Sequence, residues 1–313
     1  MKAELLHVVT CVSNPLRWKS RIDCARKAIT EWVADGTNVY VVECAFGERD
    51  WELTDIPGIT HIPVRAYSMA WNKENLMNIG ISRLPHDAKY IMVADADIHF
   101  RKRNWPAEVV HALQAHPVIQ PWHTALDLGP NDETIQMHRS FCSLYHEEKP
   151  VIPNGNKFWK FNGGPYDYSH PGYVWAYTRK FLEETGGLID FCGMGSGDHH
   201  MAYALIGEVD TTIPQGTTES YTKLLKMWED RAVRSANYNI GFVSQTIEHY
   251  FHGRKQDRGY TTRWDMFLNH QFDPATDLKK NTYGVVEFSG NKPDLIRSWD
   301  NYMRERREDV SSL

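Results

Sequence analysis

Two aspartates, Asp95 and Asp97, stand one residue apart at the end of the apolar segment YIMVA, in YIMVADADIHF. Residues i and i+2 of a β-strand share a face, so both carboxylates are expected to point into one crevice. Two close carboxylates repel each other unless a proton or a cation lies between them. Hard oxygen ligands suit Mg²⁺ or Mn²⁺, which could bind a diphosphate and neutralise it as it leaves. The alternative is a solvated strand end with a turn-forming aspartate, which is the more frequent context of an isolated Asp-x-Asp.

The elements up to this pair are expected in the order strand, helix, strand, strand, helix, strand. The segment LLHVVTCV (Leu5–Val12) is expected to form the first strand, and apolar residues at helical spacing predict a helix over Arg21–Ala34. Two strands in GTNVYVVECAFG and GITHIPV, a helix in WNKENLMNIGISRLP and a fourth strand in AKYIMVADAD are expected to follow. This order is typical of an α/β protein with a mostly parallel sheet covered by helices.

Polar residues stand at the carboxyl ends of three of these strands. They lie in Cys11–Asn14, Glu43–Phe46 and Asp95–Asp97. Ligands of open α/β sheets bind outside these ends, so the three segments are expected to converge on one crevice.

The second half of the chain has weaker signals. PVIQPWHTALDL is expected to be one strand and IGFVSQTIEHYFHG to be strand-like. Residues 130–170 are rich in Gly, Pro, Asn and aromatic residues and are expected to be a long functional loop. The charged tail from residue 254 to 313 is expected to be an irregular wrap that ends in a helix near RSWDNYMRERRED.

Composition indicates an ordinary soluble protein. The 313 residues carry a net charge of −5, so no overall basic field indicates a polyanionic partner. Five scattered cysteines without a CxxC pair argue against a disulfide framework or a zinc ribbon and fit a reducing cytosol. No apolar run is long enough for a signal peptide or a membrane span, so a cytoplasmic location is expected.

The strand YIMVADADIHF resembles the Asp-x-Asp strand of the GT-A fold glycosyltransferases, the family 2-like enzymes that use nucleotide-sugars. The preceding NKENLMNIGISRLPHDAK resembles the helix before that strand in the family. PGYVWAYTRKFLEETGGLIDFCGMGSGDHHMAYAL is similar to the second half of these enzymes, where a Gly-rich loop presents an acidic residue at a helix start. HYFHGRKQDRGY resembles the segment that supplies a metal-binding histidine in many members. The resemblance covers roughly residues 5–260.

The resemblance implies a role for each matching residue. Asp97 would bind the metal directly, and Asp95 would bind ribose, the metal or a metal-bound water. Asp198 would be the general base that deprotonates the acceptor hydroxyl; its alternative role is that of a carboxylate stabilising a helix N-terminus. The remaining donor-binding assignments are Glu43, Thr10 and Asn14 around the nucleotide base, and Lys73 and Asn78 at the phosphates or the sugar.

The two histidines of HYFHG are distinguished by strand geometry. Residues three apart on a strand point to opposite faces, so only one is expected to reach the metal. His252, next to a glycine, is the expected ligand, and His249 is expected to be a packed strand histidine. Arg254, Lys255 and Arg258 are expected to close over the diphosphate.

The acceptor side has fewer candidates. Tyr173 and Trp175, with His170 and Gly172, are candidates for an acceptor-binding wall, although a core position is equally expected for Trp175.

The resemblance implies a GT-A domain over residues 1–262, with residues 263–313 as an extension packed on it. The expected activity is metal-dependent transfer of a hexosyl or pentosyl group from a nucleotide-sugar, most commonly a UDP-sugar, to an acceptor hydroxyl. Inversion is expected, with Asp198 as the base and Mn²⁺ or Mg²⁺ as cofactor. The sequence leaves open whether the acceptor is a glycan, a protein, a lipid-linked sugar or a modified nucleic-acid base. The alternatives are a metal-dependent phosphohydrolase and a non-catalytic carbohydrate-binding protein.

Overall fold

The computed structural model describes residues 3–149, 151, 169–259 and 263–310. Within them a central sheet has seven strands in the order β11-β6-β10-β4-β1-β2-β3. Strands β1 to β4 run parallel, β10 runs antiparallel between β4 and β6, and β11 is parallel to β6. The predicted α/β class with a mostly parallel sheet is therefore confirmed. The strands are β1 (Leu6–Ser13), β2 (Asn38–Phe46), β3 (Ile59–Ala66), β4 (Tyr90–Ala94), β6 (Val118–Gln120), β10 (Val174–Thr178) and β11 (Ile240–Phe242).

A second sheet lies beside the first. Its strand order is β5-β12-β7-β8-β9, and its strands are β5 (Ile98–Phe100), β7 (Thr124–Leu128), β8 (Thr134–Ser140), β9 (Ser169–His170) and β12 (Thr246–His249). PVIQPWHTALDL is thus two strands in different sheets, so the expectation of one strand was wrong. Pro121 follows β6 directly, and a proline has no N–H to continue a sheet ladder.

The region expected to be one long loop is partly regular structure. Strand β8 and helix α4 (Phe141–His146) occupy part of it. Residues 152–168 of this region lie outside the described residues.

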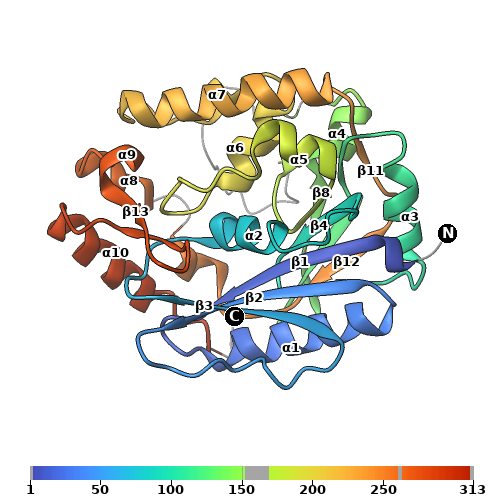
Figure 1. The fold of residues 1–313 in the computed structure, drawn as a ribbon, viewed down its shortest axis with the longest axis horizontal. Coiled ribbons are helices and arrows are strands. Elements are labelled where there is room, and N and C mark those ends of the chain that lie inside the picture. The colour runs from blue at the N-terminus through green and yellow to red at the C-terminus, as the bar shows by residue number, and fades with distance from the viewer. Residues whose placement is uncertain (1–2, 150, 152–168, 260–262, 311–313) are drawn as a thin grey trace.

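Helices cover both faces of the central sheet (Figure 1). Helix α1 (Lys19–Ala34) and helix α3 (Trp105–Ala112) bury Ile29, Trp32 and Trp105 in one apolar cluster. The opposite face carries α2 (Lys73–Ile81), α5 (Arg179–Thr185), α6 (Gly197–Ala204) and α7 (Glu219–Ala236). Gly80 lets α2 approach the sheet closely, because a Cβ atom there would lie 2.5 Å from Cγ1 of Val9. The start of α2 lies beside the carboxyl end of β1, where Sγ of Cys11 donates to the carbonyl of Lys73 (3.5 Å).

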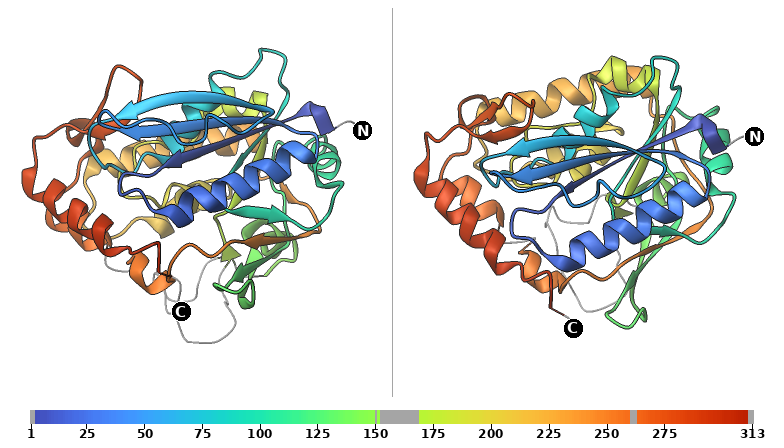
Figure 2. Two further views of the ribbon diagram at one scale, coloured as in Figure 1. Left: turned by 90° about the horizontal axis from the view of Figure 1, so that it is seen from below. Right: turned by 60° about the horizontal axis from the view of Figure 1, so that its bottom comes forward.

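The C-terminal residues pack into the core on the face that carries α7. Their elements are α8 (Arg263–Asn269), α9 (Pro274–Asp277), the hairpin of β13 (Leu278–Lys280) and β14 (Val286–Phe288), and α10 (Pro293–Glu305). Phe267 and Trp299 are buried in the apolar cluster that also contains Trp228 of α7. The predicted terminal helix is confirmed, and the chain beyond it reaches the beginning of α1 (Figure 2).

Short 3-10 helices complete the described elements, at Ala3–Leu5, Val209–Thr212 and Lys255–Arg258. In the described part of the chain, each helix is either too short or too polar to cross a lipid bilayer.

Candidate functional site

A cavity of about 250 Å³ lies at the carboxyl ends of β1 and β4. Residues Cys11–Ser13 and Asp95–Asp97 line it, as predicted, whereas Glu43–Phe46 at the end of β2 do not. Its lining includes the acidic residues Glu74, Asp95, Asp97 and Asp198, the basic residues Arg21, Lys73, Lys255, Arg258, Arg263 and Arg306, and the histidines His170, His199, His249 and His252.

Asp95 and Asp97 lie in the turn that joins β4 to β5 and hence the two sheets. Strand β4 ends at Ala94, so the expectation that the pair shares one face of a strand was wrong. The Asp95 amide donates a hydrogen bond to the carbonyl of Tyr173 (2.9 Å), outside the regular ladder. In this turn the two carboxylates face different partners, although both line the cavity.

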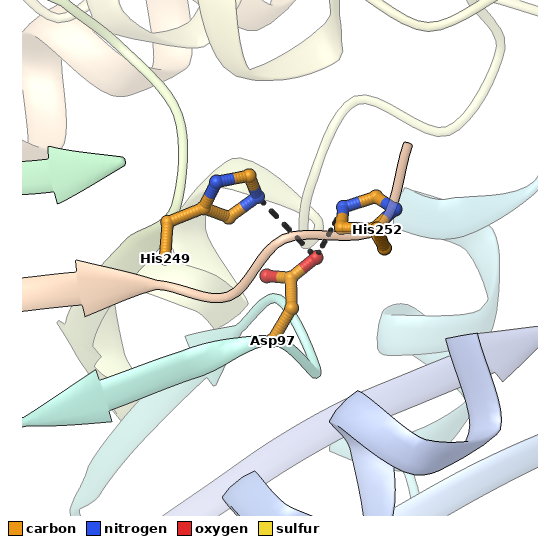
Figure 3. Close-up of side chains that lie close together, drawn as sticks. All are labelled: Asp97, His249 and His252. Atoms are coloured by element: carbon orange, nitrogen blue, oxygen red, sulfur yellow. Dashed lines mark ion pairs between the residues drawn. The ribbon is translucent and has the colours of Figure 1, made fainter. Parts of the chain in front are cut away.

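Asp97 faces two histidines. Its Oδ2 lies 3.0 Å from Nε2 of His252 and 3.5 Å from Nε2 of His249 (Figure 3). One ligand atom from each of the three residues lies within 4.8 Å of the others, so the cluster can hold a metal ion. The structure thus brings His252, the expected ligand, next to Asp97; its role as a ligand stays a prediction.

The expectation that His249 is only a packed strand residue was wrong. His249 is the last residue of β12, and the chain then leaves the strand. The amide of Tyr250 donates a hydrogen bond to the carbonyl of Asp97 (2.9 Å), which holds this segment against the β4–β5 turn. Strand periodicity therefore does not extend from His249 to His252, and both rings reach Asp97.

The chemistry of the cluster fits a divalent cation. Oδ1 of Asp97 is buried and has no hydrogen-bond partner among the described residues, which is costly for a carboxylate oxygen. Burial alone would raise the pKa of Asp97, but the charges and hydrogen bonds of His249 and His252 hold it well below its usual range. Nε2 of His252 also lies 3.1 Å from Nη2 of Arg258, and this contact must shift when a metal binds there.

Lys73 lies between the remaining carboxylates. Its Nζ is 3.0 Å from Oδ1 of Asp95, 3.9 Å from Oε1 of Glu74 and 4.0 Å from Oδ2 of Asp198. Burial lowers the pKa of Lys73, but the three carboxylates raise it by more, to well above its usual value. Burial raises the pKa of Asp95, while the Lys73 charge opposes this. Lys73 is therefore a permanently charged ammonium inside the cavity.

Asp198 stands in the first turn of α6, and its side chain is 29% exposed to the cavity. Its Oδ1 accepts a hydrogen bond from the backbone amide of His199 (2.8 Å), so the carboxylate also stabilises the N-terminus of α6. Oδ2 remains directed to Lys73 and Gly172. A Cβ atom at Gly172 would lie 3.0 Å from this oxygen, which indicates how closely the two segments approach.

The first strand's predicted base-binding residues do not line the cavity. Oγ1 of Thr10 donates a hydrogen bond to the carbonyl of Ala94 (2.7 Å) and is fully buried. The amide of Asn14 bonds the backbone N–H (3.0 Å) and carbonyl (2.9 Å) of Trp18. Thr10 thus joins β1 to β4, and Asn14 closes the turn between β1 and α1.

Three further predicted donor-binding residues are also absent from the cavity lining. Glu43 accepts hydrogen bonds from the amides at positions 52 and 53 and contacts His61. The side-chain amide of Asn78 donates a hydrogen bond to the carbonyl of Leu188 and accepts one from the Leu188 backbone N–H, both at 2.9 Å. Arg254 pairs with Asp257 (3.2 Å).

The acceptor-wall candidates divide in two. His170, Gly172 and Tyr173 line the cavity, and the rings of His170 and Tyr173 stack at 4.1 Å between centroids. Trp175 is 3% exposed and donates to the carbonyl of Pro171 (2.6 Å), so it is a core residue.

Sequence reasoning missed Glu74 and Arg263, which both line the cavity. Glu74 follows Lys73 in the first turn of α2, and it is buried where α6 packs closely against it. Gly197 of α6 lies so close that a Cβ atom there would be 2.9 Å from Cδ of Glu74. Arg263 begins α8, far along the chain, and nothing in its neighbourhood marks it as a cavity residue.

Comparison with known proteins shows distant structural similarity. No protein-family model and no curated protein matches the chain. TarS residues 1–349 from S. aureus in complex with UDP-GlcNAc is 8% identical, with 98% of this chain and 82% of that chain covered and a TM-score of 0.43. Glucosyl-3-phosphoglycerate synthase from Mycobacterium tuberculosis, in complex with Mn²⁺, UDP and glucosyl-3-phosphoglycerate, is 12% identical, with 85% and 76% covered and a TM-score of 0.41.

The catalytic domain of Drosophila beta1,4-galactosyltransferase 7 in complex with xylobiose is 12% identical, with a TM-score of 0.34. The comparison covers 67% of this chain and 62% of that chain. All three similarities have TM-scores below 0.5 and identities of 12% or less, so they indicate neither an activity nor a substrate for this chain.

Proposed function

We propose that the chain is a metal-dependent glycosyltransferase of the GT-A type, which moves a sugar from a nucleoside-diphosphate sugar to an acceptor hydroxyl. The proposal is carried by three groups in one cavity: the cluster of Asp97 with two histidines, the Lys73 ammonium and the Asp198 carboxylate. A cation site beside a permanent ammonium suits the charge of a diphosphate. A carboxylate at the same cavity suits removal of a proton from a hydroxyl.

Asp97, His249 and His252 would hold the cation. One carboxylate and two imidazole nitrogens favour a first-row transition metal such as Mn²⁺ over Mg²⁺, which prefers hydrated sites built from oxygen ligands. When bound, the ion supplies a Lewis acid that stabilises negative charge on the departing diphosphate.

The chain's own cations would complete diphosphate binding. Lys73 is half-buried beside Asp95, and the neighbouring carboxylates raise its pKa well above the usual value, so its ammonium is charged before a ligand arrives. Lys255, Arg258 and Arg263 face the same cavity. Asp95, held by Lys73, is proposed to bind a ribose hydroxyl or a water on the metal. A diphosphate entering here would exchange water for preorganised positive charge, which favours its release as a leaving group.

The acceptor would bind on the side of Asp198. Its Oδ2 lies beside Gly172, close to the stacked rings of His170 and Tyr173, and such rings suit the apolar face of a sugar. Asp198 would accept the proton of the acceptor hydroxyl as that oxygen attacks the anomeric carbon from the side opposite the diphosphate. Direct displacement of this kind inverts the anomeric configuration.

Product analysis tests the proposal. The purified chain is incubated with a panel of nucleotide-sugars, Mn²⁺ and hydroxyl acceptors, and the nucleotide and sugar products are identified by mass spectrometry. Release of nucleoside diphosphate with transfer of the sugar supports the proposal. Release of inorganic phosphate from phosphomonoesters would instead indicate a phosphohydrolase. Sugar binding without turnover would indicate a carbohydrate-binding protein.

A further inference from the structure

The carboxylate of Glu308, near the C-terminus, lies buried against the proposed metal ligand His252. Oε2 of Glu308 is 3.4 Å from Nδ1 of His252, and the Glu308 side chain is 1% exposed. The opposite ring nitrogen, Nε2, faces Asp97 at 3.0 Å. Glu308 therefore contacts the ring on the side away from the cluster.

A buried carboxylate needs compensation, and two arginines provide it. Nε and Nη2 of Arg21, on α1, donate to the two oxygens of Glu308 at 3.0 Å and 2.6 Å. Nη2 of Arg306 lies 2.7 Å from Oε1. The two-point contact with Arg21 fixes the plane of the carboxylate, so Glu308 can in turn fix the orientation of the His252 imidazole.

The second histidine of the cluster has a matching arrangement. Nδ1 of His249 lies 2.9 Å from Oδ1 of Asp127, which is 1% exposed. Asp127 also accepts a hydrogen bond from the hydroxyl of Tyr173 (2.7 Å). Each imidazole therefore has a buried carboxylate at Nδ1 and presents Nε2 to Asp97. Metal-binding histidines commonly donate their second N–H to a carboxylate, which sets the tautomer and the ring orientation.

The segment that carries Glu308 is anchored on both sides. The carboxylate of Asp309 accepts hydrogen bonds from the first backbone amides of α1, at Lys19 (3.0 Å) and Ser20 (2.8 Å), and so caps that helix. Gly253, one residue after His252, approaches the segment so closely that a Cβ atom there would lie 2.7 Å from Cα of Glu308. The C-terminal segment is therefore packed directly on the loop that bears the metal ligand.

We propose that Glu308 is a positioning residue for the metal site: through His252 it makes the C-terminal segment part of the site. This inference rests on the proposed metal site of Asp97, His249 and His252. It assigns to the C-terminal segment a role in metal affinity that packing alone would not give it.

Titration with Mn²⁺ alone, followed by the electron paramagnetic resonance signal of the free ion, tests this role. Glu308→Gln keeps the shape of the side chain and is expected to weaken Mn²⁺ binding roughly 10-fold; Glu308→Ala is expected to weaken it by up to roughly 100-fold. Glu305→Ala, at an exposed position of the same segment, is the matched control and should bind as the wild type does. Asp309→Ala removes the helix cap but keeps the Glu308 carboxylate. It should therefore lower the thermal midpoint while the affinity for Mn²⁺ changes little.

The outcomes separate the two proposals. If wild-type protein and Asp97→Ala bind Mn²⁺ equally, the metal site itself is wrong. If Asp97→Ala loses binding while a folded Glu308→Gln binds with wild-type affinity, the metal site stands and the role of Glu308 is refuted. Folding of each variant is checked by its thermal midpoint. In the active enzyme, Glu308→Gln should raise the Mn²⁺ concentration for half-maximal rate and change kcat at saturating Mn²⁺ much less.

Discussion

Nζ of Lys73 lies 3.0 Å from Oδ1 of Asp95, so the first aspartate of the Asp-x-Asp pair faces a cation of the chain itself. The second aspartate, Asp97, faces two histidines instead. The pair thus divides into a carboxylate that orients an ammonium and a carboxylate suited to a metal ion.

Replacing Lys73 by Gln should lower kcat/KM by roughly 100-fold to 1000-fold, the range found when one preorganised group that stabilises transition-state charge is lost. Initial rates of nucleoside diphosphate release measure this. Lys89→Gln, at an exposed position, is the control and should leave the rate unchanged. A Lys73→Gln enzyme with the parental kcat/KM would exclude Lys73 from diphosphate stabilisation.

Asp198→Asn should lower kcat by roughly 100-fold to 10,000-fold, because a general base contributes about that much. The variant should still bind the nucleotide-sugar, since Asp198 lies on the acceptor side. Steady-state kinetics together with calorimetric binding of the donor separate the two effects. Asp210→Asn, at an exposed position, is the control and should keep the parental kcat. An unchanged kcat in Asp198→Asn, or an equal loss of kcat in the control, would show that Asp198 is not the base.

The buried carboxyl of Glu74 should make stability depend on pH. Burial raises its pKa from 4.5 to about 7, although the Lys73 charge opposes this. Between these values the unfolded chain releases a proton that the folded chain keeps, so the free energy of unfolding falls as pH rises. At about 1.4 kcal/mol for each pKa unit, the loss is about 3 kcal/mol by pH 8.

Glu74→Gln should remove this dependence, so it should narrow the difference in urea midpoint between pH 5 and pH 8. Glu52→Gln, at an exposed position, should keep the wild-type difference. Identical pH dependence in wild type and Glu74→Gln would contradict the raised pKa.

Trp299→Ala should lower the free energy of unfolding by about 3–5 kcal/mol, the usual cost of removing a fully buried large aromatic residue. Trp299 is 0% exposed, and its indole N–H donates to the carbonyl of Met69, which lines the cavity. Calorimetry should show one transition at a lower midpoint. A separate, earlier transition for residues 263–313 would mean that the extension unfolds independently. Tyr283→Ala, at a residue that is 44% exposed, should change stability little.

Much of the fold could be predicted from local patterns. The buried strands β1, β2 and β4 are mostly apolar, and α1 and α7 carry apolar residues at helical spacing, so in each case the local pattern agrees with the burial in the structure. Short strands that change sheet, such as β6 and β7, were merged, because the sheet to which a strand belongs depends on contacts distant in sequence.

The site was predicted less completely. Asp95, Asp97, Asp198 and His252 were placed in the cavity, but the partners of each carboxylate depend on a turn that a strand pattern does not indicate. His249 was missed because β12 ends at that residue. Asp127 and Glu308 are separated from their histidines by 122 and 56 positions, and no local spacing links them.

Bound Mn²⁺ offers the most direct measurement of the central claim, that Asp97, His249 and His252 jointly hold the catalytic cation. Electron spin-echo envelope modulation of the Mn²⁺-loaded protein detects nitrogen nuclei coordinated to the ion. The wild type should show modulation from two imidazole nitrogens, His249→Ala and His252→Ala should each show one, and the double variant none. Bound Mn²⁺ without nitrogen modulation in the wild type would contradict the claim.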